Sequence, residues 1–289
     1  MADATHPSKA VVVTGCSSGI GRATASRLAG AGWTVYATAR RIEAIAGLQA
    51  DGCRLLALDV TDEASMQAAV AAVEAEHGAI GVLVNNAGYS QSGAIESVAI
   101  DDVRRQFETN VFGLVRLTQL ALPAMRAQRW GKIVNVSSMG ANFTFPGGGF
   151  YHATKYALEA ISDALRFEVK GFGIDVAIIQ PGIIRTGFSG AAVASIGSDA
   201  ATGDGPYDDF NAKVAQATTD VYEKGPLAKL GGGPDAVAKA IESAITAGHP
   251  KIRYRVTPSA RLLIGQRAVM SDGLWDRFLR MQFPQPGKR

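Results

Sequence analysis

Short apolar, β-branched runs alternate with helix-like stretches along most of this chain. The expected strands lie at about 10–14, 33–39, 53–58, 80–85, 131–137, 174–180 and 252–257, and helices fill the gaps, notably 63–77, 101–128 and 152–170. Alternation of this kind implies parallel strands joined by right-handed crossovers. The predicted fold class is therefore α/β, a doubly wound parallel sheet of seven strands with helices on both faces.

The length and composition fit a single domain over residues 1–289. The chain has 289 residues and is 47% hydrophobic, enough to bury one substantial core. Its two cysteines, Cys16 and Cys53, have no disulfide or metal-site spacing, which favours a reducing, cytoplasmic setting. The polar first residues do not resemble a secretory signal, and no apolar run is long enough to span a membrane.

The first expected strand leads into a glycine-rich loop and then into a helix. Residues 14–21 read T-G-C-S-S-G-I-G, and residues 22–29 have a helical pattern. A strand, a glycine loop and a helix in this order let bare backbone amides and the helix dipole bind a pyrophosphate. The glycine spacing is G-x-x-x-G-x-G, not the more familiar G-x-G-x-x-G.

The same loop also fits G-x-S-x-G, the nucleophile elbow of α/β-hydrolases, with Ser17 as the nucleophile. That chemistry needs a histidine base and an orienting acid later in the chain. The later histidines, His77, His152 and His249, have no persuasive partner carboxylate in sequence. The elbow also usually follows a later strand, so the hydrolase is the weaker interpretation.

Tyr151 and Lys155 are four residues apart in an expected helix and therefore share one helix face. An ammonium beside a phenol favours the phenolate, so we expect Lys155 to lower the pKa of Tyr151 and to prepare it for proton transfer. Ser138 follows the expected strand 131–137, where its hydroxyl can bind a substrate oxygen. The neighbouring His152 should face away and be a bystander. Taken alone, the Tyr151–Lys155 pair also fits a half-exposed surface pair.

Together with later motifs, these residues resemble the short-chain dehydrogenase/reductase superfamily in its single-domain form, with a Rossmann-type sheet. The further matches are Leu58-Asp59-Val60, Asn85-Asn86-Ala87-Gly88, Asn110, and Pro181-Gly182-Ile183-Ile184-Arg185-Thr186. They follow the family's order over residues 10–186, whereas residues 187–289 carry no comparable signature.

The resemblance implies hydride transfer between a nicotinamide cofactor and a carbonyl or secondary alcohol. It assigns catalysis to Asn110, Ser138, Tyr151 and Lys155. The expected cofactor contacts are Gly15, Ser17, Ser18, Gly19, Ile20, Arg40, Arg41, Asp59, Val60, Asn86, Ala87, Gly88, Tyr151, Lys155, Pro181, Gly182, Ile184 and Thr186. Asn110 should interrupt its helix and, by analogy, seat a water that relays protons to Lys155. No cluster of side chains has metal-site spacing, so no catalytic metal is expected.

The end of the second expected strand indicates which cofactor is preferred. An NAD-binding site usually places an acid there, on the ribose 2′-hydroxyl. Here Ala39 holds that place, and Arg40 and Arg41 follow. A guanidinium can bind a 2′-phosphate with two hydrogen bonds, so we expect NADP(H) to be preferred over NAD(H), with Arg40 as the main contact.

The expected substrate is hydrophobic. By analogy, the pocket is lined by Tyr89, Met139, Gly140, Ala141, Phe143, Phe145, Pro146, Phe150 and Phe188, which are nearly all apolar. This favours a steroid-, retinoid- or lipid-like ketone or alcohol over a sugar or a short hydroxy acid. Residues 187–233 are expected to form a substrate lid; a disordered surface loop is the alternative. A second alternative for the aromatic residues is that they only pack the lid against the core.

Residues 258–289 form an expected C-terminal extension within a basic tail. From residue 251 onward the chain has nine basic and two acidic residues, with apolar residues between them. Such a segment could touch an anionic membrane surface, but a helix pair that packs its apolar stripe on the body is favoured.

The expected partners are a small carbonyl or alcohol substrate and further copies of this chain, with no nucleic acid. Pairing of helices 101–128 and 152–170 across a two-fold axis, by family analogy, would give a homodimer or homotetramer. A catalytically idle nucleotide-binding regulator on the same fold remains an alternative. The complete tetrad argues against it.

Overall fold

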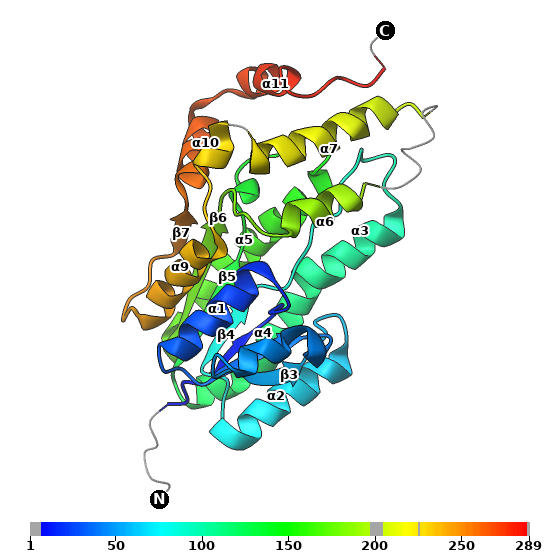
Figure 1. Ribbon diagram of the computed structural model, residues 1–289. Helices are drawn as coiled ribbons and strands as arrows, with labels where there is room; N and C mark the ends of the chain where they lie inside the picture. Colours follow the sequence, from blue (N-terminus) through cyan, green and yellow to red (C-terminus); the bar gives the residue numbers. More distant parts are fainter. Residues whose placement is uncertain (1–6, 197–204, 225, 288–289) are drawn as a thin grey trace, which may run out of the picture.

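The computed structural model describes residues 7–196, 205–224 and 226–287 (Figure 1). The seven strands are β1 (Val11–Val13), β2 (Val35–Ala39), β3 (Arg54–Ala57), β4 (Val82–Asn85), β5 (Gly131–Val136), β6 (Ile174–Pro181) and β7 (Arg253–Val256). They form one sheet in the order β3-β2-β1-β4-β5-β6-β7, and every neighbouring pair is parallel. The predicted sheet is confirmed, and the strand order reverses between β1 and β4, where the sequence places the glycine loop.

The central strands are continuous apolar runs because both of their faces are buried. In β1, Val11 and Val13 contribute to one core and Val12 contributes to the other. The register pairs Val12 with Tyr36 of β2 and with Leu83 of β4, so the second core extends across the sheet.

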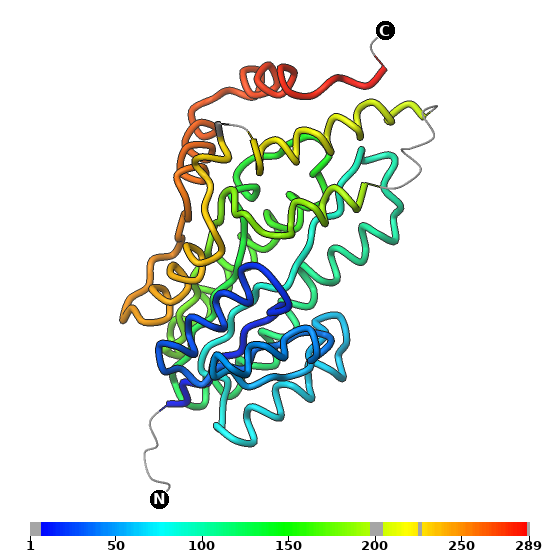
Figure 2. The backbone as a smooth tube through the Cα atoms, viewed as in Figure 1, coloured from blue at the N-terminus to red at the C-terminus, as the bar shows by residue number. Residues whose placement is uncertain are grey.

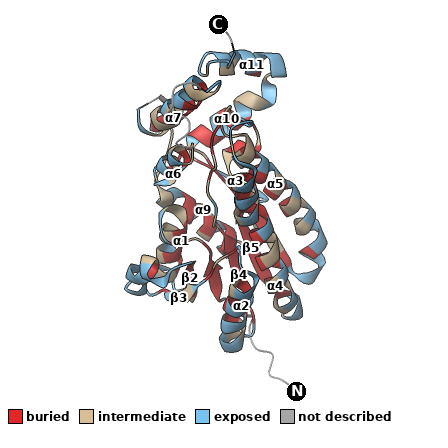
Figure 3. Ribbon diagram, turned by 90° about the vertical axis from the view of Figure 1, so that its right-hand side faces the viewer, coloured by how far each residue is buried: buried red, intermediate tan, exposed pale blue. Residues whose placement is uncertain are grey.

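Helices cover both faces of the sheet. The first core receives side chains from α1 (Gly19–Gly30), the 3₁₀ segment η1 (Ile42–Gln49) and α9 (Pro234–Thr246). The second core receives them from α2 (Glu63–His77), α4 (Gly113–Ala127) and α5 (Gly149–Val169). Figure 3 shows the buried sheet between helices whose outward faces are exposed.

The predicted helix 101–128 is divided into three parts. These are α3 (Ile100–Phe107), the π-helical segment η2 (Glu108–Phe112) and α4. Asn110 lies within the π-helical segment, so the predicted interruption of helix bonding is confirmed. π-helical turns inside helices are found mostly at functional sites.

The region after β6 contains more regular structure than its small residues indicate. It includes α6 (Phe188–Ala194), α7 (Asp208–Glu223) and α8 (Pro226–Lys229), and β7 is followed by α10 (Pro258–Val269) and α11 (Asp272–Arg280). The remaining short segments are the 3₁₀ turns η3 (Met139–Ala141) and η4 (Lys170–Phe172). Parts of the expected lid and tail, residues 197–204, 225 and 288–289, lie outside the described residues.

The C-terminal helices pack against the body, as the favoured interpretation of the tail predicts. Ala260, Leu263 and Ile264 of α10 and Trp275 of α11 form a buried cluster with Phe143. Figure 2 shows this last part of the chain, in red, passing over the yellow α7, at the end of the molecule opposite β1 and α1. Within the described ranges, no helix combines the length and apolarity that a membrane span requires.

Candidate active site

The glycine loop leaves the backbone at the start of α1 open to a ligand. Gly15 and Gly19 have φ angles of +72° and +55°, which side chains rarely adopt. A Cβ on Gly21 would lie 2.2 Å from the Gly15 carbonyl oxygen, so the loop closes only with glycine there. Ser17 and Ser18 are exposed, and Ser18 forms no side-chain cap on α1. Free amides at a helix start suit the pyrophosphate of a dinucleotide.

Thr14 and Asn86 hold this loop against the end of β4. The Thr14 hydroxyl accepts hydrogen bonds from the backbone amides of Asn86 and Ala87, both 2.9 Å long. The Asn86 side-chain amide donates to the Thr14 carbonyl oxygen (2.8 Å) and to the Gly15 carbonyl oxygen (3.2 Å). The Asn86 side chain thus supports the loop, and the predicted cofactor contact of Asn86 stays a prediction. Thr14 was missed; its position at the end of the apolar run, directly before Gly15, is the signal that could have identified it.

The predicted adenosine side of the site lies at the ends of β2 and β3. Ala39 is buried at the end of β2, and Arg40 and Arg41 are exposed beyond it. The Asp59 carboxylate accepts from both the amide (2.9 Å) and the hydroxyl (2.8 Å) of Thr61. Val60 is buried in the second core, so of these predicted contacts the two arginines present the most open side chains.

Asn110 joins three elements beneath the predicted site. Its side-chain amide donates to the Tyr89 carbonyl oxygen (2.9 Å) and to the Thr154 hydroxyl of α5 (3.1 Å). Its side-chain oxygen accepts from the Tyr89 amide (3.1 Å), and a Cβ on Gly88 would lie 3.0 Å from that oxygen. Asn110 therefore ties the loop after β4 to the helix that carries Tyr151. Thr154 was not identified from the sequence.

Ser138, Tyr151 and Lys155 converge where β5 ends and α5 begins. The Ser138 hydroxyl accepts a 3.0 Å hydrogen bond from the Gly140 amide, and it is a hydrogen-bonding neighbour of Tyr151. The buried Lys155 ammonium donates to the Val136 carbonyl oxygen (2.9 Å) and lies 5.7 Å from the centre of the Tyr151 ring. The predicted proximity of the three side chains is thus present.

The predicted lowering of the Tyr151 pKa is wrong, because the net shift is upward. Burial raises the pKa of the Tyr151 phenol, and hydrogen bonding with Ser138 offsets only part of that rise. Burial also lowers the pKa of Lys155 to about 8. Both shifts are toward the uncharged form, because removal from water penalises the charged species.

The loop after β6 reaches the glycine loop through Thr186. A Cβ on Gly19 would lie 3.3 Å from the Thr186 methyl group. Pro181 is the last residue of β6, and a Cβ on Gly182 would lie 2.4 Å from the Ser259 hydroxyl. The Ile184 side chain belongs to the first core, so Ile184 can contact a cofactor only through its backbone. A hollow of about 600 Å³ lies between α1, the loop after β6 and the start of α9, with Arg22, Arg185, Thr186 and Asp235 among its lining residues.

The expected substrate wall is only partly where the sequence places it. The Phe188 ring lies 5.5 Å from the Tyr151 ring, so the start of α6 adjoins the predicted acid. Phe143 is buried among the C-terminal helices, whereas Phe145 is partly open and stacks on Trp275 at 5.8 Å between ring centres. Trp275 was not predicted, because it comes from the tail, far along the chain.

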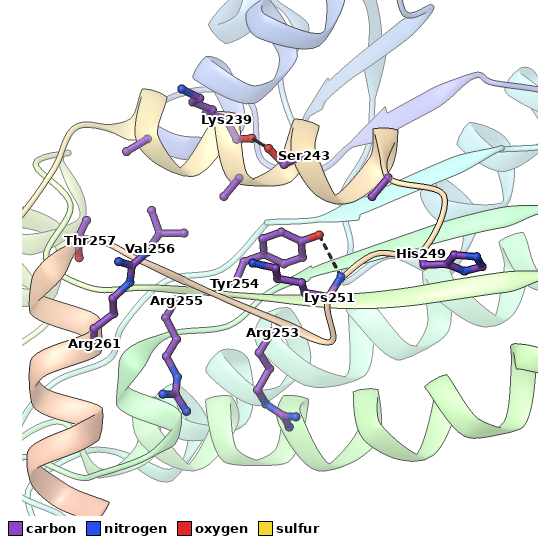
Figure 4. A pocket seen from close by; sticks show the side chains of 13 residues that line it. Lys239, Ser243, His249, Lys251, Arg253, Tyr254, Arg255, Val256, Thr257 and Arg261 are labelled. Carbon is purple, nitrogen blue, oxygen red and sulfur yellow. Dashed lines mark hydrogen bonds between the residues drawn. The ribbon is translucent and has the colours of Figure 1, made fainter.

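A second hollow, of about 870 Å³, lies away from the tetrad between α9, β7 and the start of α10 (Figure 4). Figure 4 shows Arg253 and Arg255 projecting from the side of β7 opposite to Tyr254. Arg253 is held there by Glu159 (2.8 Å) and Asp163 (2.6 Å) of α5. These charges suit an edge strand that must not pair with another chain.

The hydrolase alternative finds no support in the described residues. No histidine among them forms a hydrogen bond with Ser17: His77 contacts the Tyr36 hydroxyl and His152 contacts Gly140 and Phe145. The same part of the chain contains no group of three or more histidine, cysteine or acidic residues that could hold a metal ion.

Comparisons with known proteins agree with this geometry. The model of the short chain dehydrogenase family matches residues 9–196. The chain is 42% identical over 179 residues to a 3-ketodihydrosphingosine reductase of Bacteroides thetaiotaomicron, covering 62% of this chain but only 65% of that protein, less than two thirds of its length. It is 35% identical over 277 residues to the NADPH-dependent 3-dehydrocapnine reductase of Ornithobacterium rhinotracheale, covering 92% and 94% of the two chains. The crystal structure of a short-chain dehydrogenase from Streptomyces avermitilis superposes with a TM-score of 0.75 at 33% identity, covering 94% of this chain and 96% of that one.

Proposed function

Since this chain belongs to the short-chain dehydrogenase/reductase superfamily, an oxidoreductase family, we propose that it reduces a hydrophobic ketone, or oxidises the matching alcohol, with NADP(H). The observation that carries the proposal is the convergence of Ser138, Tyr151 and Lys155 at the end of β5. The glycine loop follows the end of the parallel strand β1, and Phe188, two residues after Thr186, adjoins the Tyr151 ring.

The residues present fit a nicotinamide dinucleotide. Open amides at the start of α1 suit the pyrophosphate, and the close approach of Gly19 to Thr186 brings the two loops to one site. Glycines 15, 19 and 21 keep the cradle free of side chains. When bound, the cofactor supplies or accepts the hydride.

The protein's part in the reaction is to position the substrate oxygen and to move one proton. Ser138 donates its hydroxyl hydrogen to the substrate oxygen, and Tyr151 gives its phenol proton to the alkoxide that forms in reduction. The raised pKa of Tyr151 keeps the phenol protonated at neutral pH, which suits the reducing direction. Lys155 stabilises the phenolate left behind, and Asn110 keeps α5 in place through Thr154.

Arg40 is proposed to select the phosphorylated cofactor. It is exposed directly after the buried Ala39, and no acidic residue occupies that strand end. A guanidinium can bind a 2′-phosphate with two hydrogen bonds. NAD(H) has no 2′-phosphate and is therefore disfavoured only because it cannot make these two bonds. A relative of this chain is named as NADPH-dependent, which supports the same preference.

The substrate is proposed to be a hydrophobic, lipid-like ketone. Phe188 adjoins the Tyr151 ring, and Phe145 and Trp275 add an aromatic wall on the side of the C-terminal helices. Two relatives are named as reductases of 3-ketodihydrosphingosine and 3-dehydrocapnine. Burial of apolar surface contributes about 25 cal/mol per Å² to the free energy of binding, so such a wall binds larger apolar ligands more tightly. Residues 187–233 are proposed as the lid of this pocket.

The test is a series of ketones of rising apolar size, assayed with NADPH and with NADH by the absorbance of the reduced nicotinamide. We expect kcat/KM to rise with size and to be higher with NADPH, and we expect Arg40→Ala to remove most of the NADPH preference. Arg129→Ala, an exposed arginine outside the site, is the matched control. A flat or falling series, with a polar or anionic carbonyl reacting faster, contradicts the substrate class. Turnover with none of the carbonyls, despite NADPH binding, favours the idle regulator.

A further inference from the structure

His152 is buried beside Tyr151 and bridges two points of the loop that follows Ser138. Its Nδ1 lies 2.7 Å from the Gly140 carbonyl oxygen, and its Nε2 accepts a 3.3 Å hydrogen bond from the Phe145 amide. His152 was expected to be a bystander, but its ring does contact the loop that follows Ser138. Residues 152 and 155 are three positions apart, so both lie on the face of α5 that is turned toward this loop and β5.

The two contacts define one state of the imidazole. A carbonyl oxygen only accepts, so Nδ1 carries the hydrogen, and a backbone amide only donates, so Nε2 carries none. The ring is therefore neutral. Protonation would place a second hydrogen on Nε2, directed at the Phe145 amide, and that hydrogen bond would be lost. Burial lowers the pKa of His152 and so supports the neutral form.

Two glycines make room for the ring. A Cβ on Gly140 would lie 2.6 Å from Nδ1, and a Cβ on Gly148 would lie 3.0 Å from Cδ2. The rings of Phe143 and Phe145, on the loop, lie 6.4 and 6.3 Å from the imidazole. On α5 itself, the titratable side chain of Tyr151 faces the ring, at 5.9 Å between ring centres. The loop side chains that face the ring, Phe143 and Phe145, are uncharged.

The ring is connected to Ser138 through a single peptide segment. The Gly140 carbonyl accepts from His152, and the Gly140 amide donates to the Ser138 hydroxyl oxygen at 3.0 Å. That donation occupies one lone pair of the hydroxyl and leaves its hydrogen free to point at a substrate oxygen. The contact with the Phe145 amide fixes the far end of the loop, where Phe145 forms part of the aromatic wall.

We propose that His152 is a positioning residue that orients the Ser138 hydroxyl through Gly140 and holds Phe145 of the aromatic wall, and that its protonation breaks the Phe145 contact and loosens the loop. The inference rests on the proposed reductase function, since its effect is read at the substrate site. In acid, kcat/KM for the ketone falls as His152 gains a proton, while binding of NADPH at the glycine loop is unaffected.

The test compares His152→Asn and His152→Phe with the wild type over pH 5.5–9. Asparagine keeps a donor for Gly140 and cannot titrate; phenylalanine keeps the bulk and loses both hydrogen bonds. Misplacement of a reacting group by about 1 Å can cost roughly 10²-fold, so we expect kcat/KM of His152→Phe to fall at least tenfold at every pH, with the Kd for NADPH unchanged. We expect His152→Asn to remain within about tenfold of the wild type at pH 8 and to lack the acid limb of the profile.

Wild-type kcat/KM in His152→Phe, or an unchanged acid limb in His152→Asn, would overturn the proposal. Nitrogen NMR of the wild-type imidazole gives a readout that needs no turnover. As the ring gains its proton, the amide signals of Gly140 and Phe145 should shift with the same midpoint. If these signals shift together but no ketone is reduced, the reductase proposal fails while the positioning contact stands; if they do not shift, the contact itself is wrong.

Discussion

The two side chains proposed to move and stabilise the proton, Tyr151 and Lys155, are both held in surroundings that disfavour charge. Lys155 is 6% exposed and its ammonium contacts a backbone carbonyl rather than a carboxylate. Burial lowers its pKa from an ordinary value of 10.5 to about 8. This state costs the folded protein stability at neutral pH, since the unfolded chain solvates the same ammonium freely.

Replacement of Lys155 by methionine therefore changes how stability depends on pH. Between pH 8 and 10.5 the unfolded wild type still holds a proton that the folded protein has released, so wild-type stability rises with pH relative to the variant. Each pKa unit corresponds to 1.36 kcal/mol, so the difference in unfolding free energy should change by up to about 3 kcal/mol. Denaturant unfolding of the cofactor-free proteins measures it. A difference that stays constant from pH 7 to 10.5 would show that Lys155 is not desolvated.

At the scale of elements, the glycine loop depends on the close approach of Gly21 to Gly15. An alanine Cβ at position 21 would meet the Gly15 carbonyl oxygen at 2.2 Å and the Asn86 amide nitrogen at 2.6 Å. Gly30, at the other end of α1, has no heavy atom within 4 Å of the same position. One helix thus offers both a crowded glycine and an open one.

We expect Gly21→Ala to lose about 1–3 kcal/mol of stability and to weaken NADPH binding at least tenfold, because overpacking must displace the loop. Gly30→Ala should bind NADPH normally and be unchanged or more stable by up to about 1 kcal/mol. Thermal unfolding and titration calorimetry give the two readouts. Equal NADPH affinity in Gly21→Ala and the wild type would remove this loop from the cofactor site.

The elements that the sequence predicts well are those whose pattern reflects burial on both faces. All seven strands were found, and each boundary lies within two residues of its expected place. The convergence of Ser138, Tyr151 and Lys155 could be expected, because Ser138 follows a strand end and Tyr151 and Lys155 share a helix face, whereas the role of Asn110 came only from the family resemblance. The contacts of His152, Thr14 and Trp275 could not be expected, since each joins segments that become neighbours only after folding. The direction of the Tyr151 pKa shift was missed for the same reason, because the burial that raises this pKa exists only after folding.

For the whole molecule, the outward face of α5 indicates where a second copy could pack. Exposed residues recur there every three or four positions and are mostly apolar; they are Ala153, Tyr156, Ala160, Ala164 and Phe167. Phe167 is 84% exposed, and Phe112 at the start of α4 is 55% exposed. An apolar stripe of this length on a surface helix is typical of a subunit interface, in agreement with the pairing expected from the family.

We therefore expect Phe167→Asp to convert a dimer or tetramer into smaller species, with a concentration-dependent mass in sedimentation velocity. Val269→Asp is the matched control, because Val269 is 85% exposed on α10, away from this stripe. A monomeric wild type would contradict the predicted oligomer, and dissociation by Val269→Asp alone would place the interface on the C-terminal helices.

The central claim is that Tyr151 passes the proton in a nicotinamide-linked carbonyl reduction. Its most direct test is single-turnover oxidation of bound NADPH by the best ketone, in the wild type, Tyr151→Phe and the control Tyr254→Phe. A general acid contributes roughly 10²–10⁴-fold, so Tyr151→Phe should lose at least that much of the chemical rate while its Kd for NADPH stays the same. Tyr254→Phe should react like the wild type. A Tyr151→Phe enzyme that keeps a tenth of the wild-type rate, with chemistry limiting, would contradict the account.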